Sequence, residues 1–328
     1  MRAHCIESPG KRRDNGRVPR KLLMPMMLVG LLGALAWMPL RQAGWLPHAA
    51  PTAVDAGVAP AVRSFSPSSA TPVLRPASVR AVPALSPLRR GFEDSTDLFA
   101  YSRQLVALAA AGDADAMWLL SLVQDHCAGY AADPVGYAQD TRVIAGLGLS
   151  GSDAMIAARQ RVQQRCGRFV PQDGFSLPTL ITQRTQAARA GSLAAEAALL
   201  AMDQPLQRDD DYRRDLVRRV LDSEDPFAYL AIAPVMGAIG SGQRDTLGEV
   251  SGSELSEIAW RIASCQLGMD CSPGGSMMTN YCVNGGICSQ DASQDFTTFA
   301  RDAGVPRQGA DNVDDMVGTL LAPTGVDG

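Results

Sequence analysis

The sequence predicts an all-α fold, built of helical hairpins in a solenoid-like arrangement, for the part of the chain that follows residue 90. Three observations lead to this prediction. Ala, Leu, Met and Arg recur there at three-to-four-residue spacing, sustained alternation of Val, Ile, Thr or Tyr is absent, and turn glycines return roughly every 40 residues. The composition, 46% hydrophobic and 20% charged, is typical of a globular chain.

The N-terminus predicts export from the cytoplasm. Residues 1–21 carry seven Lys and Arg against two acidic residues, and residues 22–40 follow as an uncharged apolar run. A helix of that length spans about 28 Å, close to the hydrocarbon thickness of a bilayer, and the positive charges hold the preceding segment in the cytoplasm. We therefore expect residues 22–40 to be a single-pass anchor in the inner (cytoplasmic) membrane, with the C-terminal domain in the periplasm.

A cleaved signal sequence is the alternative interpretation of the same segment. Ala34, Leu35 and Ala36 form an A-x-A-like peptidase site, and cleavage there would leave a secreted or periplasmic protein. The basic region is long for a signal peptide, and apolar character continues through Leu40. These two features favour an uncleaved anchor.

Residues 41–90 predict a linker between the membrane and the folded part. The segment contains eight prolines, six arginines and one aspartate, and it lacks a periodic apolar face. We expect an extracytoplasmic helical domain over residues 91–302 and a mobile tail over residues 303–328. After residue 90 the chain has 17 basic against 31 acidic residues and no Lys, so a nucleic-acid partner is not expected.

A helical hairpin is predicted at the start of the helical domain. Asp94, Ser95 or Thr96 caps a first helix, which ends at Gly112, and Asp113 opens a second helix through ADAMWLLSLVQDHC. Leu and Ala positions on the two helices are spaced to pack against each other.

The junction of this hairpin recurs along the chain. LAAAGDADAMWLL surrounds Gly112, AARAGSLAAEAALL surrounds Gly191, and a weaker copy, LGLSGSDAMIAAR, surrounds Gly151. A constant period is typical of repeat proteins. Residues 95–235 resemble the Sel-like repeats of the tetratricopeptide-like α-solenoid group, although the aromatic and glycine positions of each first helix are matched only approximately. The resemblance implies stacked helical hairpins that present binding surfaces.

Six cysteines follow the predicted anchor, and they predict three disulfides in an oxidising compartment. The last four form two copies of C-x-x-G-x-x-C, and pairing within each copy or across the copies fits equally. A zinc site is the alternative, but the spacing exceeds the usual two to four residues. We expect Cys127 to bond to Cys166, since both end helices in neighbouring hairpins. The six are Cys127, Cys166, Cys265, Cys271, Cys282 and Cys288.

Motifs for catalysis, metal binding or cofactor binding are not found, so we assign no catalytic residue, metal ligand or cofactor. His126 is expected to be a surface or helix-capping residue. Paired carboxylates are the remaining route to hydrolysis, and none of the exported glutamates has a recognisable surrounding motif. These are Glu93, Glu196, Glu224, Glu249, Glu254 and Glu257.

The sequence therefore favours a membrane-anchored, periplasmic helical module that binds a protein or an envelope component. The alternative is a cell-envelope glycan hydrolase that uses two carboxylates.

Overall fold

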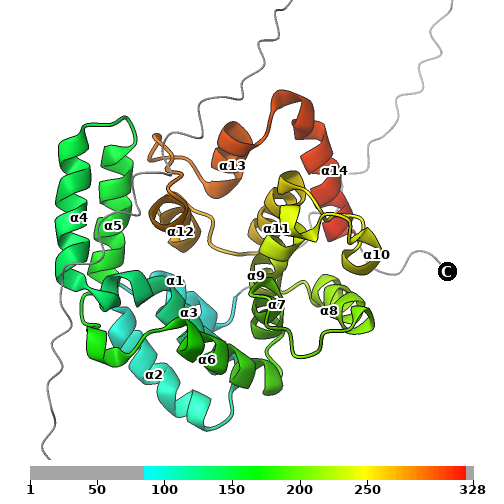
Figure 1. Ribbon diagram of the computed structural model, residues 1–328, viewed down its shortest axis with the longest axis horizontal. Helices are drawn as coiled ribbons and strands as arrows, with labels where there is room; N and C mark the ends of the chain where they lie inside the picture. Colours follow the sequence, from blue (N-terminus) through cyan, green and yellow to red (C-terminus); the bar gives the residue numbers. More distant parts are fainter. Residues whose placement is uncertain (1–84, 323–328) are drawn as a thin grey trace, which may run out of the picture. The chain divides into compact units, whose positions relative to one another are not determined.

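The computed structural model describes residues 85–322, and helices form its secondary structure throughout (Figure 1). This range contains fourteen α-helices, three short 3-10 helices and no β-strand, which confirms the all-α prediction. The α-helices are α1 (Pro87–Asp94), α2 (Leu98–Ala110), α3 (Ala114–Ala132), α4 (Pro134–Leu147), α5 (Ser152–Cys166), α6 (Leu177–Arg189), α7 (Leu193–Ala201), α8 (Asp210–Ser223), α9 (Pro226–Met236), α10 (Arg244–Leu247), α11 (Glu254–Gln266), α12 (Ser276–Gly285), α13 (Phe296–Gly304) and α14 (Ala310–Leu321), and the 3-10 helices are η1 (Pro171–Asp173), η2 (Ala238–Gly240) and η3 (Arg307–Gly309).

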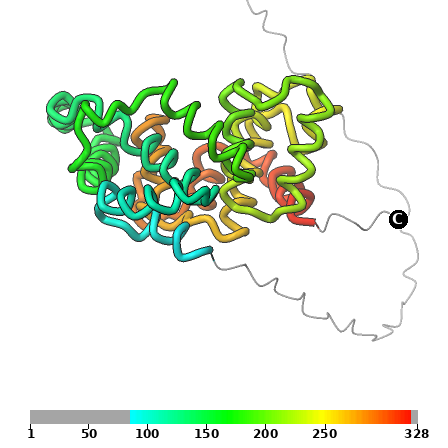
Figure 2. The backbone as a smooth tube through the Cα atoms, turned by 90° about the horizontal axis from the view of Figure 1, so that it is seen from below, coloured from blue at the N-terminus to red at the C-terminus, as the bar shows by residue number. Residues whose placement is uncertain are grey.

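The helices from α2 to α11 pack largely in succession, and α12 then packs back against the first half of the domain. Helix α2 packs on α3, α3 on α6, α6 on α7, α7 on α9, and α9 on α11. Helix α12, orange in Figure 2, packs against α5, so a helix from the last third of the domain lies beside helices from its first half. The return of α12 closes one side of the space between α3, α9 and α11, where the candidate site lies.

Two of the three recurring junctions adopt the same turn. Gly112 and Gly191 both take positive φ angles, +93° and +107°, which glycine tolerates better than other residues. Asp113 and Ser192 then cap α3 and α7 by accepting hydrogen bonds from backbone amides three residues later. Gly151 differs, because its φ is −94° and no side chain caps α5. The relation to Sel-like repeats stays a prediction.

Helical structure begins inside the range expected to be linker. Helix α1 starts at Pro87, which is pre-organised for the first turn, and Ser86 caps it. Because α1 occupies the residues up to Asp94, the cap of α2 falls on Asp97 and not on the three residues before it. Most of the linker, residues 41–84, lies outside the described residues.

Arg89 connects α1 to α3 and α9 through ion pairs. Its guanidinium donates to Asp115 at the start of α3 and to Asp225, the residue that caps α9. The closest contacts are 2.7 Å to Asp115 and 2.6 Å to Asp225. The Arg89 side chain is 18% exposed, so these charge-assisted bonds are partly shielded from water.

The expectation of a mobile tail over residues 303–328 is wrong for most of that range. Helix α14 packs against α11 and buries Val313, Val317 and Leu320, which repeat at helical spacing. The carbonyl of Leu320 also accepts a hydrogen bond from the Tyr229 hydroxyl at 3.0 Å. Acidic and glycine residues between the three apolar positions obscured this stripe in the sequence.

The six cysteines after residue 85 form three disulfides. Cys127 bonds to Cys166 and joins α3 to the last residue of α5, as predicted. The four others pair among themselves, also as predicted, and the structure selects pairing within each C-x-x-G-x-x-C copy. These bonds are Cys265–Cys271 and Cys282–Cys288.

The expected membrane segment cannot be compared with the structure. Residues 1–21 and 22–40 lie outside the described range. Within residues 85–322, no helix combines the length and the apolar character needed to cross a bilayer.

Candidate functional site

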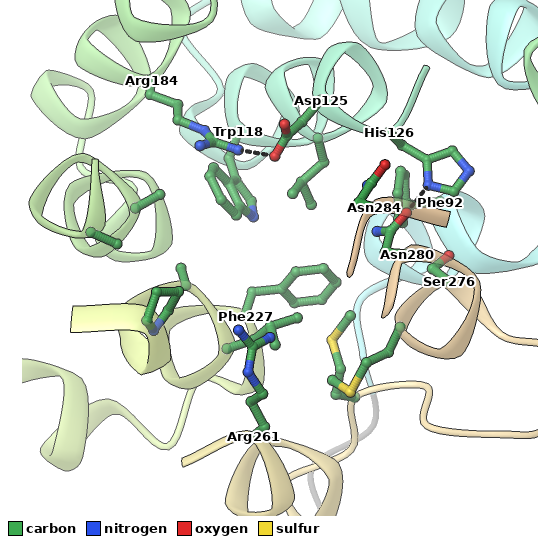
Figure 3. A pocket seen from close by; sticks show the side chains of 18 of the residues that line it. Phe92, Trp118, Asp125, His126, Arg184, Phe227, Arg261, Ser276, Asn280 and Asn284 are labelled. Carbon is green, nitrogen blue, oxygen red and sulfur yellow. Dashed lines mark hydrogen bonds and ion pairs between the residues drawn. The ribbon is translucent and has the colours of Figure 1, made fainter. Parts of the chain in front are cut away.

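A cavity of about 330 Å³ lies among helices α1, α3, α6, α7, α9, α11 and α12 (Figure 3). This size is at the lower end of the range typical of small-molecule sites. Large apolar side chains form most of its walls, and they come from segments far apart in the sequence. They include Phe92, Trp118, Phe227, Leu230, Met277 and Tyr281.

On one wall, Arg184 is fixed by partners of its own. Its Nη2 donates to Asp125 at 2.7 Å, and its guanidinium lies 5.4 Å from the centre of the Trp118 ring. The Arg184 side chain is 8% exposed, whereas Asp125 is 54% exposed. The charge of Arg184 is therefore balanced within the protein, and the pair forms a rigid, neutral part of the wall.

Arg261 enters the cavity from α11, with its guanidinium directed toward Phe227 in Figure 3. Its Nε and Nη2 both donate to one oxygen of Glu257, at 3.2 and 2.6 Å, and its guanidinium lies 5.1 Å from the Tyr281 ring centre. Among the described residues, Nη1 of Arg261 has no hydrogen-bond or ion-pair partner. This cation thus keeps one donor available to the cavity.

Asn280, on α12, is held by a buried histidine. Nδ1 of His126 lies 3.0 Å from Oδ1 of Asn280, and the His126 ring meets Phe92 edge to face. Burial and the nearby Arg165 lower the pKa of His126 to about 4, so the imidazole is neutral at pH 7 and donates to Oδ1. Within the described part of the chain, Nδ2 of Asn280 has no partner, and Figure 3 shows the amide at the cavity.

The expectation that His126 lies on the surface or caps a helix is wrong. Helix α3 continues to Ala132, and His126 is 6% exposed on a face covered by other helices. Local patterns in the sequence cannot reveal Asn280 as its partner, because the two residues are 154 positions apart.

Next to the cavity, Glu93 forms a buried network with two residues from other helices. Ser276 donates to Oε2 of Glu93, and Arg165 donates to Ser276 at 2.9 Å. Burial raises the pKa of Glu93 to about 7. The other oxygen, Oε1, is enclosed and has no partner among residues 85–322. Glu93 therefore has the pKa of a general acid and lines a second cavity of about 180 Å³ beside α5 and α12, although its unpartnered oxygen is enclosed.

The glutamates of the described residues do not assemble into one catalytic pair. Glu196 bonds to Arg219, and Glu257 bonds to Arg261. Glu249 and Glu254 are exposed, and Glu224 takes a left-handed conformation at the end of α8. The described residues also contain no group of three His, Cys, Asp or Glu side chains placed to hold a metal ion.

Comparisons with protein-family models, with curated proteins and with solved structures found no match to this chain. Function therefore has to be inferred from the residues themselves. Sequence patterns did not single out Arg184, Arg261 or Asn280, because they lie on three helices and belong to no motif. Asn280 stands two positions before Cys282, so the second cysteine motif was the one signal close to the site.

Proposed function

We propose that this protein is a membrane-anchored periplasmic module that binds an envelope component in the cavity between α3, α9, α11 and α12. The cavity carries the proposal, because it combines apolar walls with a few polar groups directed inward, which is the usual composition of a binding site. The N-terminal sequence supports the location, since residues 22–40 have the length and character of a membrane anchor. Three disulfides also suit an oxidising compartment.

Site-specific photocrosslinking in intact cells tests this function. A photoreactive amino acid replaces Leu230, which lines the cavity, or Leu206, a partly exposed leucine outside it. We expect a captured species from position 230 and none from position 206, identified by mass spectrometry. Adding Ala231→Trp, which places a large side chain in the cavity, should abolish the capture. Equal capture from both positions would contradict the proposal.

The raised pKa of Glu93 favours one second candidate, a glycan hydrolase with Glu93 as its general acid. This function would require α1 or α12 to move, because the free oxygen of Glu93 is enclosed. A zymogram on bacterial wall material separates the two candidates. Clearing by the wild-type protein that disappears in Glu93→Gln and persists in Glu249→Gln would establish the hydrolase and reject the binding module.

A further inference from the structure

We propose that the ligand of this cavity is a monoanionic carboxylate on an apolar body, with Arg261 as the residue that binds the carboxylate. This inference rests on the proposed function and adds the chemical class of the ligand. The class follows from the charges that face the cavity, from the donors that the protein leaves unused, and from the character of the walls.

The balance of charge favours an anion over a cation. The lining contains two arginines and one acidic residue, Asp125, and Asp125 is already bonded to Arg184. Glu257, the partner of Arg261, does not line the cavity, and its side chain is 29% exposed against 17% for Arg261. Both side chains are partly exposed, and of this pair the Arg261 guanidinium is the charge that lies at the cavity, so an anion bound there meets a cation at close range.

The unused donors favour an acceptor group on the ligand. Nη1 of Arg261 and Nδ2 of Asn280 have no partner among the described residues, and each belongs to a side chain already fixed by another bond. Arg261 is held by Glu257 and Asn280 is held by His126, so little conformational entropy is lost when a ligand binds. A guanidinium N–H to a carboxylate forms a strong, charge-assisted hydrogen bond.

The walls limit the anion to one charge and require an apolar body. A phosphate group with two charges calls for several cations, whereas the second arginine of the lining, Arg184, is already bonded to Asp125 and Met202, and only its enclosed Nε lacks a partner among the described residues. Phe92, Phe227 and Met277 offer apolar surface to the rest of the ligand. A fatty acid and a peptide C-terminus with an apolar last residue both have this chemistry.

Calorimetric titration of the whole chain in lipid nanodiscs, with empty nanodiscs as the blank, provides the test. The probes are two matched pairs: octanoate with octanamide, and N-acetylphenylalanine with N-acetylphenylalaninamide. Each pair keeps the apolar body and exchanges the carboxylate for a neutral amide. In at least one pair the carboxylate should bind about tenfold more tightly, the difference between a charge-assisted and a neutral hydrogen bond. The pair that binds more tightly distinguishes a fatty acid from a peptide terminus.

Three variants assign the effect to the site. Arg261→Gln should remove the preference for the carboxylate, while Arg261→Lys, which keeps the charge, should retain part of it. Asn280→Asp keeps the acceptor for His126 and replaces the donor by a negative oxygen, so carboxylate binding should fall by tenfold or more. Arg301→Gln is the matched control, because Arg301 also pairs with one carboxylate, Asp314, outside the cavity.

The outcomes separate this inference from the proposed function. Equal affinity for carboxylate and amide, or an equal effect of Arg261→Gln and Arg301→Gln, would overturn the carboxylate assignment. If the amides bind and Ala231→Trp abolishes that binding, the cavity remains a binding site and only the ligand class is wrong. If no probe binds, the carboxylate assignment fails, and capture from position 230 in intact cells then decides the proposed function by itself.

Discussion

Replacing Glu93 by Gln should change how the stability of the protein depends on pH, because Glu93 and His126 titrate in opposite directions. Both are buried near Arg165, whose guanidinium bonds to Ser276 beside Glu93 and lies 5.2 Å from the centre of the Phe92 ring, which contacts His126. The pKa of Glu93 rises from 4.5 to about 7, chiefly through burial, with Asp270 also raising it and Ser276 and Arg165 lowering it. The pKa of His126 falls from 6.5 to about 4, chiefly through burial and then through Arg165.

The two shifts give stability slopes of opposite sign. A raised pKa means that the folded state binds the Glu93 proton more tightly, so this contribution is complete below pH 4.5 and is lost as the pH rises through 7. A lowered pKa means that the His126 contribution is complete above pH 6.5 and is lost as the pH falls through 4. Each slope is about 1.4 kcal/mol per pH unit, so the slopes nearly cancel between pH 4.5 and 6.5.

In the wild-type protein the two pH dependences of the unfolding free energy nearly cancel. Replacing Glu93 or His126 alone should therefore make the contribution of each residue measurable. Guanidinium denaturation followed by circular dichroism, at half-unit steps from pH 4.5 to 7.5, gives the free energy of unfolding. The difference between wild type and Glu93→Gln should fall by about 3 kcal/mol over this range, and the difference between wild type and His126→Gln should rise by a similar amount. Glu249→Gln, the same change at an exposed site, should leave the profile unaltered. A flat difference for Glu93→Gln, or one that rises with pH, would refute the reasoning.

Two further predictions concern the disulfides and the membrane. Replacing Cys127 and Cys166 together by Ala should lower the free energy of unfolding by about 4 kcal/mol, because their bond spans 39 residues. Replacing Cys265 and Cys271, which are six residues apart, should lower the free energy of unfolding by about 2.4 kcal/mol on the same loop-entropy model. Denaturant titrations measure both losses, and a larger loss for Cys265 and Cys271 than for Cys127 and Cys166 would contradict the model. Cell fractionation should recover the full chain with the membranes through residues 22–40, whereas a soluble chain that begins within that segment would show cleavage and leave only the prediction of export.

Local features of the sequence predicted the local structure well. Gly112 and Asp113 identified the turn between α2 and α3, because a positive φ and an N-cap each require particular residue types. The pairing of Cys127 with Cys166 followed from their places near the ends of predicted helices. Helix α14 was missed, since its apolar positions are few and its burial depends on α11.

The candidate site could not be predicted in the same way. Arg261 and Asn280 face one cavity only because α12 returns to pack against α5. The position of α12 depends on contacts between segments more than 100 residues apart, such as the bond from Arg161 to Thr279. Periodicity and spacing describe neighbours along one helix, so they contain no information on such contacts.

The forked contact of Arg89 gives the N-terminal edge of the domain a particular resistance to tension. A pull along the chain from the preceding residues would reach α1 first, and α1 is bonded through Arg89 to Asp115 and Asp225. The two carboxylates stand on helices separated by more than 100 positions, so the load divides between two parts of the domain. Detachment of α1 requires both ion pairs to break, in addition to the hydrogen bonds that α1 makes with Tyr101, Arg165 and Ser276. Arg89→Met should therefore lower the force at which the domain first yields in a single-molecule pulling experiment.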